Sequence, residues 1–379
     1  MDDVVTVHAI PAALPEAPRS SRTSFTGMRR EFIGLVLRGG LLELCTAGFY
    51  RFWLATAMRR HLWSNTVVDG DALEYTGRAV ELLLGFLFAL AILVPFYLIN
   101  FLIGIEAERY KVFASTPLVL AFYFFYQFAI YRARRYRATR TVWRGTRFWM
   151  KGSGWSYAWR ANLWGLLVIL TLGFALPWRE AALERYKMGN TYFGDVPCRF
   201  AGTGGELFKR CWGLWLLSFL IVTFPFIYPV FKARVWRWWV EGIRIGDVHC
   251  ESELPGNAFI GLFWKTVGWI MFAGAIDSAV IMIPVAAVLQ RVGTTADKLA
   301  PFLEQYSTHI FVANILNYLV MALAGGIIMR IYFLWGVWSR VVASTTLHNI
   351  DAADFVRAQG AEASALGEGF ADSLDVAGF

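Results

Sequence analysis

The chain has 379 residues, of which 57% are hydrophobic, 17% aromatic and only 17% charged. A typical soluble domain carries about 25% charged residues, so the composition disfavours a soluble enzyme, a disordered scaffold and a disulfide-rich secreted module. The net charge is +8, and its placement along the chain is more informative than its size.

The two ends of the chain differ from the rest in composition. Residues 1–24 contain three prolines and no basic segment that leads into an apolar core, and residues 357–379 are rich in Ala, Gly, Ser, Asp and Glu. We expect two poorly ordered tails, the second of them acidic. The remaining residues, 25–356, are expected to form one repeat-containing membrane domain.

Long apolar stretches recur through that domain. A bilayer core of about 30 Å needs about 20 apolar helical residues. Four stretches meet this length or come close to it: 80–105, 112–131, 258–289 and 310–338. Three others contain charges, prolines or glycines, so they either cross the bilayer or enter it and bend back: 31–53, 157–178 and 207–231.

Residues 132–151 form a basic segment with eight Lys or Arg and no acidic residue. The positive-inside rule predicts that this connection is cytoplasmic. Either it serves only as a topology signal, or it binds anionic lipid headgroups, to which each basic residue contributes about 1 kcal/mol. Nucleic-acid binding is disfavoured because the segment lies between two apolar stretches. The headgroup candidates are Arg132, Arg134, Arg135, Arg137, Arg140, Arg144, Arg147 and Lys151.

The sequence contains an internal repeat. Residues 40–82 align without gaps on residues 165–207, with 14 of 43 positions identical, and a further shift of 52 residues gives a third, more divergent copy. A shorter copy of the first unit follows 75 residues after it. Such self-similarity indicates recurring structural units.

Each of the two clearest copies contains a Thr-x-Gly-Phe sequence within its apolar stretch. Glycine after threonine can break a helix where neighbouring groups satisfy the freed backbone, and prolines interrupt the third stretch. The helix-break candidates are Thr46, Gly48, Thr171, Gly173, Pro225 and Pro229. The sequence leaves open whether these stretches re-enter the bilayer or cross it.

The segments that follow, 65–70 and 190–195, combine β-forming residues with turn residues. They predict small β-hairpins at the cytoplasmic face. The expected fold is therefore an all-α polytopic membrane protein with internal repeats and small β-hairpin elements.

These motifs resemble those of the YjgN-like bacterial inner-membrane proteins, a family of unknown function. The resemblance rests on Thr-x-Gly-Phe-x-x-x-Trp at 46–53 and 171–178, Arg-x-x-x-x-Asn-Thr at 60–66 and 185–191, and Tyr-x-Gly-x-x-x-Glu-Leu at 75–82 with its copy at 200–207. It covers about residues 24–356. It implies a multi-pass protein of the bacterial inner membrane, with no known substrate, cofactor or catalytic residue to carry over.

Polar residues inside the apolar stretches are the main site candidates, because an ionisable group at a helix centre costs about 2.5–3.5 kcal/mol on insertion scales. Asp277 is the strongest, and an ion pair with Arg330 is conceivable if the two helices are antiparallel. Asn314 and Asn317 could complete a polar patch. The alternative interpretation is structural: neighbouring helices supply the hydrogen-bond and charge partners of all four residues.

No metal site, cofactor motif, nucleotide fingerprint or catalytic triad stands out among the scattered Cys and His residues. An enzyme is therefore the least favoured class. The favoured interpretation is a lipid-interacting or scaffolding membrane protein whose partners are lipids with anionic headgroups, with homo-oligomerisation left open. The alternative is a transporter or channel with a polar site near Asp277 and Arg330.

Overall fold

A computed structural model of the chain describes residues 18–106, 116–218, 224–292, 296–362 and 372. The helices are α1 (Arg29–Cys45), α2 (Arg51–Ser64), α3 (Ala79–Glu106), α4 (Thr116–Thr139), α5 (Gly154–Leu170), α6 (Leu176–Gly189), α7 (Gly204–Ser218), α8 (Phe224–Gly242), α9 (Ile260–Val292), α10 (Ala296–Ile328), the π-helical η2 (Met329–Leu334), α11 (Trp335–Ala343) and the 3₁₀ turn η3 (Ile350–Ala353). The strands are β1 (Ser20–Arg22), β2 (Ser24–Phe25), β3 (Thr66–Val68), β4 (Asp71–Ala72), β5 (Glu74–Tyr75), β6 (Thr141–Trp143), β7 (Thr146–Met150), β8 (Thr191–Phe193), β9 (Val196–Phe200), β10 (Ile243–Ile245), β11 (Val248–Ser252) and β12 (Thr345–His348).

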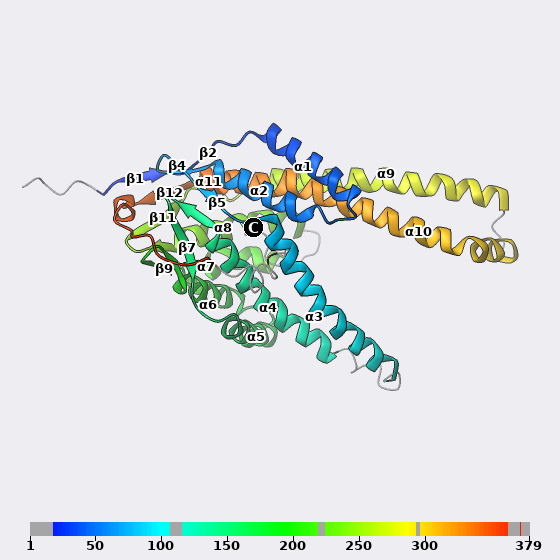
Figure 1. Ribbon diagram of the computed structural model, residues 1–379, viewed down its shortest axis with the longest axis horizontal. Helices are drawn as coiled ribbons and strands as arrows, with labels where there is room; N and C mark the ends of the chain where they lie inside the picture. Colours follow the sequence, from blue (N-terminus) through cyan, green and yellow to red (C-terminus); the bar gives the residue numbers. More distant parts are fainter. Residues whose placement is uncertain (1–17, 107–115, 219–223, 293–295, 363–371, 373–379) are drawn as a thin grey trace, which may run out of the picture.

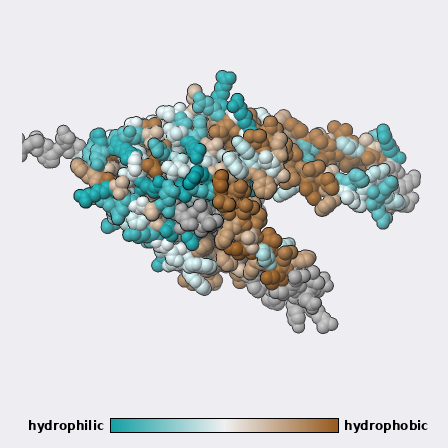
Figure 2. Space-filling view, in the orientation of Figure 1, coloured by the Kyte–Doolittle hydropathy of each residue, from teal (hydrophilic) through white to brown (hydrophobic). Residues whose placement is uncertain are grey.

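Two pairs of long helices project from a body that contains the strands (Figure 1). The arm of α9 and α10 is the longer one, and α3 and α4 form the other. Figure 2 shows that hydrophobic residues cover much of both arms, whereas hydrophilic residues predominate on the visible face of the body. This division is typical of a protein whose arms enter a membrane and whose body lies outside it.

Three helices of the described residues are long and apolar enough to cross a membrane: Ala79–Ile99, Ile260–Arg291 and Glu304–Ala343. They coincide with three of the four predicted spans. The fourth, 112–131, begins outside the described residues, and its remainder forms the first part of α4.

The prediction of an all-α polytopic fold is wrong. The described strands build a nine-stranded antiparallel, curled sheet in the order β1-β12-β11-β10-β9-β8-β7-β6-β5. Each strand has only two to five residues, so the local sequence signals hairpins at most. The sheet arises because each helical pair leaves the body and returns to it, which lets β7 pair with β8 across the intervening α5 and α6.

A second, three-stranded sheet connects the two edges of the first. The extended segment 20–25 pairs through β1 with β12 and through β2 with β3. The segment 71–75 pairs through β4 with β3 and through β5 with β6. The series of strand pairs therefore returns to the segment from which it started.

Apolar side chains fill the space between these strands. Trp143, Phe193, Val248 and Leu347 come from four different strands and cluster with Ile350 of η3. The indole nitrogen of Trp143 also donates a hydrogen bond, at 3.3 Å, to a backbone carbonyl of β3. The strands thus surround a packed core.

The three interrupted apolar stretches fold as helical pairs. The chain turns between α1 and α2 and between α5 and α6, and the helices of each pair pack against each other. Helices α7 and α8 also pack together, and residues 219–223 between them lie outside the described residues. None of these three stretches forms one continuous helix in the described part of the chain.

Parts of both expected tails belong to the body. Residues 20–22 form β1, and residues 357–362 are described as well. The backbone N–H of Asp195 donates to the carbonyl of Arg357 at 3.1 Å, and the Asp195 carboxylate accepts from the backbone N–H of Arg357 at 3.0 Å. These two bonds fix the start of the C-terminal segment beside β8.

Candidate functional site

The turn between α1 and α2 follows from its Thr-x-Gly sequence. The hydroxyl of Thr46 donates to the carbonyl of Leu42 at 2.7 Å and accepts from the backbone N–H of Tyr50 at 2.9 Å. Gly48 has φ +89° and donates to the carbonyl of Glu43 at 2.7 Å. Such a left-handed glycine ends a helix by satisfying its last carbonyls.

The turn between α5 and α6 has the same geometry. Thr171 donates to the carbonyl of Leu167 at 2.8 Å and accepts from the backbone N–H of Ala175 at 3.1 Å. Gly173 has φ +91° and donates to the carbonyl of Val168 at 2.7 Å. In the third pair, Pro225 is the second residue of α8, and Pro229 lies inside that helix.

The end of the α5–α6 pair is unusually apolar for an exposed surface. Leu172 is 81% exposed, and Ile169 and Leu170 are each 72% exposed. Phe174 in the turn and Trp212 on α7 add further exposed apolar area. A large contiguous apolar patch on a protein surface marks a membrane or a binding partner.

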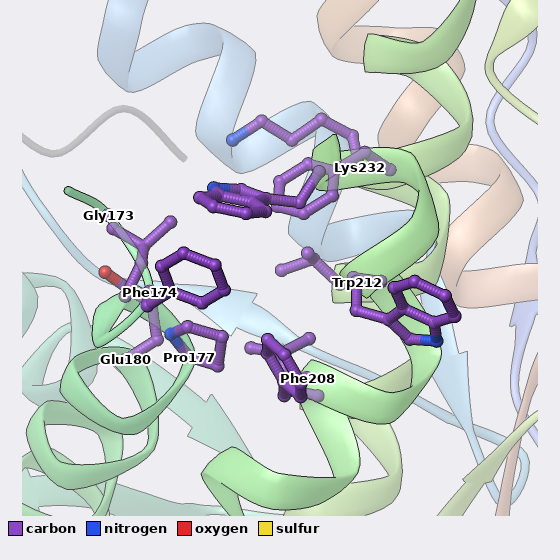
Figure 3. Close-up of a pocket in the computed structure, with 13 residues that line it drawn as sticks. Gly173, Phe174, Pro177, Glu180, Phe208, Trp212 and Lys232 are labelled. Atoms are coloured by element: carbon purple, nitrogen blue, oxygen red, sulfur yellow. The ribbon is translucent and has the colours of Figure 1, made fainter. Parts of the chain in front are cut away.

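A cavity of about 230 Å³ lies beside this apolar end, between α6, α7, α8 and the Gly173 turn (Figure 3). Its walls are mostly aromatic and aliphatic. The ring centroids of Phe174 and Trp215 lie 4.3 Å apart, and those of Phe174 and Phe208 lie 6.5 Å apart. The lining residues are Gly173, Phe174, Leu176, Pro177, Glu180, Leu207, Phe208, Cys211, Trp212, Trp215, Phe231, Lys232 and Val235.

Two charged residues, Glu180 of α6 and Lys232 of α8, contribute to the lining. In Figure 3 the Lys232 side chain extends across one side of the cavity, and Glu180 is labelled on the other side, near Phe174 and Pro177. Burial raises the pKa of the Cys211 thiol to about 11, although Arg234 and Arg210 oppose the rise. The thiol is therefore neutral at physiological pH, and the cavity is suited to binding an apolar molecule rather than to nucleophilic chemistry.

The basic segment 132–151 is engaged largely with the protein itself. Five of its arginines contact carboxylates: Arg134 with Glu184, Arg137 with Asp372, Arg140 with Glu81, Arg144 with Asp69 and Arg147 with Glu362. The Arg132 guanidinium lies over the Phe128 ring, and the Lys151 ammonium lies over the Trp149 ring. Arg135, on α4, is half-buried and has partners as well.

Two of these contacts belong to buried ionic clusters that the sequence did not reveal. Glu184 accepts from Arg134 at 3.0 Å and also contacts Lys187. Burial alone would raise the pKa of Glu184, but the two cations lower it to about 2. In the second cluster Arg59, only 2% exposed, pairs with Asp372 near Tyr75.

The polar residues of the arms do not meet as one site. Arg330, at the start of η2, donates to Glu43 of α1 at 2.8 Å, so the structure does not pair it with Asp277. Asp277 accepts from the Asn317 amide at 3.5 Å, and Asn314 donates to its own helix backbone. The partner of Arg330 was visible in the sequence only as an acidic residue interrupting the stretch 31–53.

Sequence reasoning also missed the cavity. Its charged residues, Glu180 and Lys232, belong to short helices that carry many other charges, and nothing in their spacing marks them. The Thr-x-Gly-Phe motif was the one feature of the sequence that pointed to this region, because its Gly173 and Phe174 line the cavity.

The comparisons with known proteins agree with the family resemblance noted in the sequence. No curated protein and no solved structure is significantly similar to this chain. The profile of a family described as "Bacterial protein of unknown function (DUF898)" matches residues 20–228 and 211–351, which together cover most of the chain. The chain therefore belongs to this bacterial family of unknown function, the YjgN-like family.

Proposed function

We propose that the protein is a lipid-binding protein of the bacterial inner membrane, and that the cavity between α6, α7 and α8 holds part of a lipid acyl chain. The observation that carries this proposal is the position of the cavity beside the exposed apolar end of the α5–α6 pair. Its aromatic lining fits a hydrocarbon chain, and each methylene buried there contributes about 0.8 kcal/mol.

The arrangement of the helices supports a membrane position for this cavity. Leu172 and Ile169 are more than 70% exposed at the end of the short helical pair, so this end enters the bilayer without crossing it. Helix α5 has 17 residues and is about 25 Å long, which is shorter than a full hydrocarbon core. The cavity would then open at the boundary between headgroups and acyl chains.

Lys232 supports a lipid rather than a free hydrocarbon, because the other charged lining residue, Glu180, is already paired with Arg179 at 2.6 Å. At such a boundary Lys232 would meet the lipid phosphate, while Phe208 and Trp215 contact the chain. We place the sheet and the basic segment 132–151 at the cytoplasmic surface, and the positive-inside rule supports this orientation.

Photo-crosslinking tests the cavity directly. The purified full-length protein is illuminated with phosphatidylcholine that carries a diazirine on its acyl chain, and the labelled peptides are mapped. We expect labelling between residues 173 and 235. Leu176→Trp fills the cavity and should reduce this labelling severalfold, whereas Leu170→Trp, outside the cavity on the same helical pair, should not. Unchanged labelling in Leu176→Trp would show that no acyl chain occupies the cavity.

A further inference from the structure

A second groove lies at the base of the α9–α10 arm. It is a hollow of about 520 Å³ lined by Arg29, Arg30 and Ile33 of α1, Lys265 and Trp269 of α9, and Tyr332 of η2. Helix α1 packs against both α10 and η2, which brings its first turn to the arm. Three cations from two separate helices therefore converge on one groove.

These cations lack acidic partners in the described part of the chain. No carboxylate lies within ion-pair distance of Arg29, Arg30 or Lys265 there, in contrast to the arginines of the basic segment. The nearest carboxylate along α1, that of Glu31, acts on His61 of α2. The positive charge of the groove is thus left for an external anion.

The aromatic walls hold the cations at a defined place. The Arg29 guanidinium lies 5.1 Å from the centroid of Tyr332, and Tyr332 stacks on Trp269 with centroids 5.8 Å apart. In addition, α1 begins at Arg29 without a side-chain cap, so its first backbone N–H groups add positive potential beside the guanidinium groups.

The groove continues into an apolar trough along α9. A second hollow of about 360 Å³ is lined by Lys265, Gly268, Trp269 and Phe272, and so shares two residues with the first. These residues lie along one face of the helix, and the trough they line is about 10 Å long from Lys265 to Phe272. A side chain at Gly268 would meet open space, so the trough is open along its length.

Position along the arm selects a lipid over a soluble anion. Lys265 lies in the second turn of α9, whose span Ile260–Arg291 is long and apolar enough to cross a membrane. Trp and Tyr are enriched at the level of the headgroups. A cationic pocket at this level, followed by an apolar trough in the direction of the membrane, matches a phosphate headgroup followed by its acyl chain.

We propose that this groove binds an anionic phospholipid, with the headgroup phosphate held by Arg29, Arg30 and Lys265 and the first part of one acyl chain along Gly268 and Phe272. The proposal shares with the proposed function only the membrane position of the arms, because none of its residues lines the α6–α7–α8 cavity.

Lipid titration monitored by native mass spectrometry tests the groove. The full-length protein in detergent is titrated with phosphatidylglycerol and, separately, with phosphatidylcholine of the same acyl chains. We expect the first phosphatidylglycerol to bind more tightly than the first phosphatidylcholine. One phosphate contact of about 1 kcal/mol corresponds to about a fivefold change in affinity, so Arg30→Gln/Lys265→Gln should weaken phosphatidylglycerol binding about 25-fold.

Two controls define the outcome. Arg185→Gln/Arg199→Gln removes the same charge from exposed positions outside the groove and should leave the lipid preference unchanged, whereas Arg30→Lys/Lys265→Arg should retain most of it. Unchanged phosphatidylglycerol binding in Arg30→Gln/Lys265→Gln, with thermal unfolding as in the wild type, would overturn the proposal. Competition by millimolar inorganic phosphate would overturn it too, because the site would then take a small anion. Loss of acyl crosslinking in Leu176→Trp concerns the other cavity, so the two proposals fail separately.

Discussion

Glu184 offers the clearest test of how the body is stabilised. Its carboxylate is buried between Arg134, at 3.0 Å, and Lys187. The fall of its pKa from 4.5 to about 2 corresponds to about 3 kcal/mol of folding stability at neutral pH. Burial lowers the pKa of Lys187, because the cost of removing its charge from water exceeds the attraction of Glu184. The ionised form of Glu184 is stabilised instead, because this carboxylate contacts two cations.

The sign of the pH dependence follows from the lowered pKa. Between about pH 4.5 and pH 2 the unfolded chain binds a proton at this position and the folded chain does not, so stability is full above this range and is lost as the pH falls through it. We expect Glu184→Gln to lower the free energy of unfolding by about 3–5 kcal/mol at pH 7, because it leaves buried cations without a partner. The variant should also lose this part of the acid dependence.

Thermal unfolding of the purified protein in detergent, measured from pH 7 down to pH 3, provides the assay. Glu251→Gln is the matched control, because Glu251 forms an exposed pair with His348 at 3.0 Å and such pairs contribute no more than about 1 kcal/mol. Glu184→Gln/Lys187→Met should recover part of the loss, since it removes one of the two unpaired charges. If Glu184→Gln unfolds at the wild-type temperature across this pH range, the reasoning about the buried cluster is refuted.

Four further expectations follow from the described contacts. Asp372→Asn breaks the buried pair with Arg59 and should destabilise the body by about 3–5 kcal/mol, measured as a lower thermal unfolding temperature. Gly173→Val forces a branched side chain into φ +91° and should lower the folded yield on size-exclusion chromatography, whereas Gly189→Ala, a helical position with open space, should not. Asp277→Asn keeps a partner for Asn317, so wild-type yield and lipid binding are expected, and the loss of a solute flux in reconstituted vesicles would instead support transport. Glu251→Cys, on the exposed side of β11, should resist impermeant thiol reagents in intact cells, and strong labelling from outside would place the sheet on the other side of the membrane.

The arms could be predicted from the sequence because hydrophobic length is a local property. A helix such as Ile260–Arg291 can be recognised from a long run of apolar residues. The Thr-x-Gly sequence likewise contains, within a few residues, the threonine hydroxyl and the left-handed glycine that end a helix. The sheet could not be predicted in the same way. Trp149 pairs with Tyr192 across two helices, and neither strand contains enough residues to signal a partner so far away in the chain.

The site shows a different limit of sequence reasoning. The basic segment is the most evident charge feature of the sequence, yet Arg134 and Arg140 meet carboxylates that lie 50 and 59 residues away along the chain. A buried ion pair and an exposed lipid contact require the same residue types, and only the position of the opposite charge distinguishes them. Arg29, Arg30 and Lys265 are inconspicuous in the sequence because Lys265 lies more than 230 residues after the two arginines. None of the three has a carboxylate partner among the described residues. This lack of a partner, and not the local density of basic residues, leaves their positive charge available to bind a lipid. The folded arrangement of acids thus determines which cations stabilise the body and which are left to recognise the membrane.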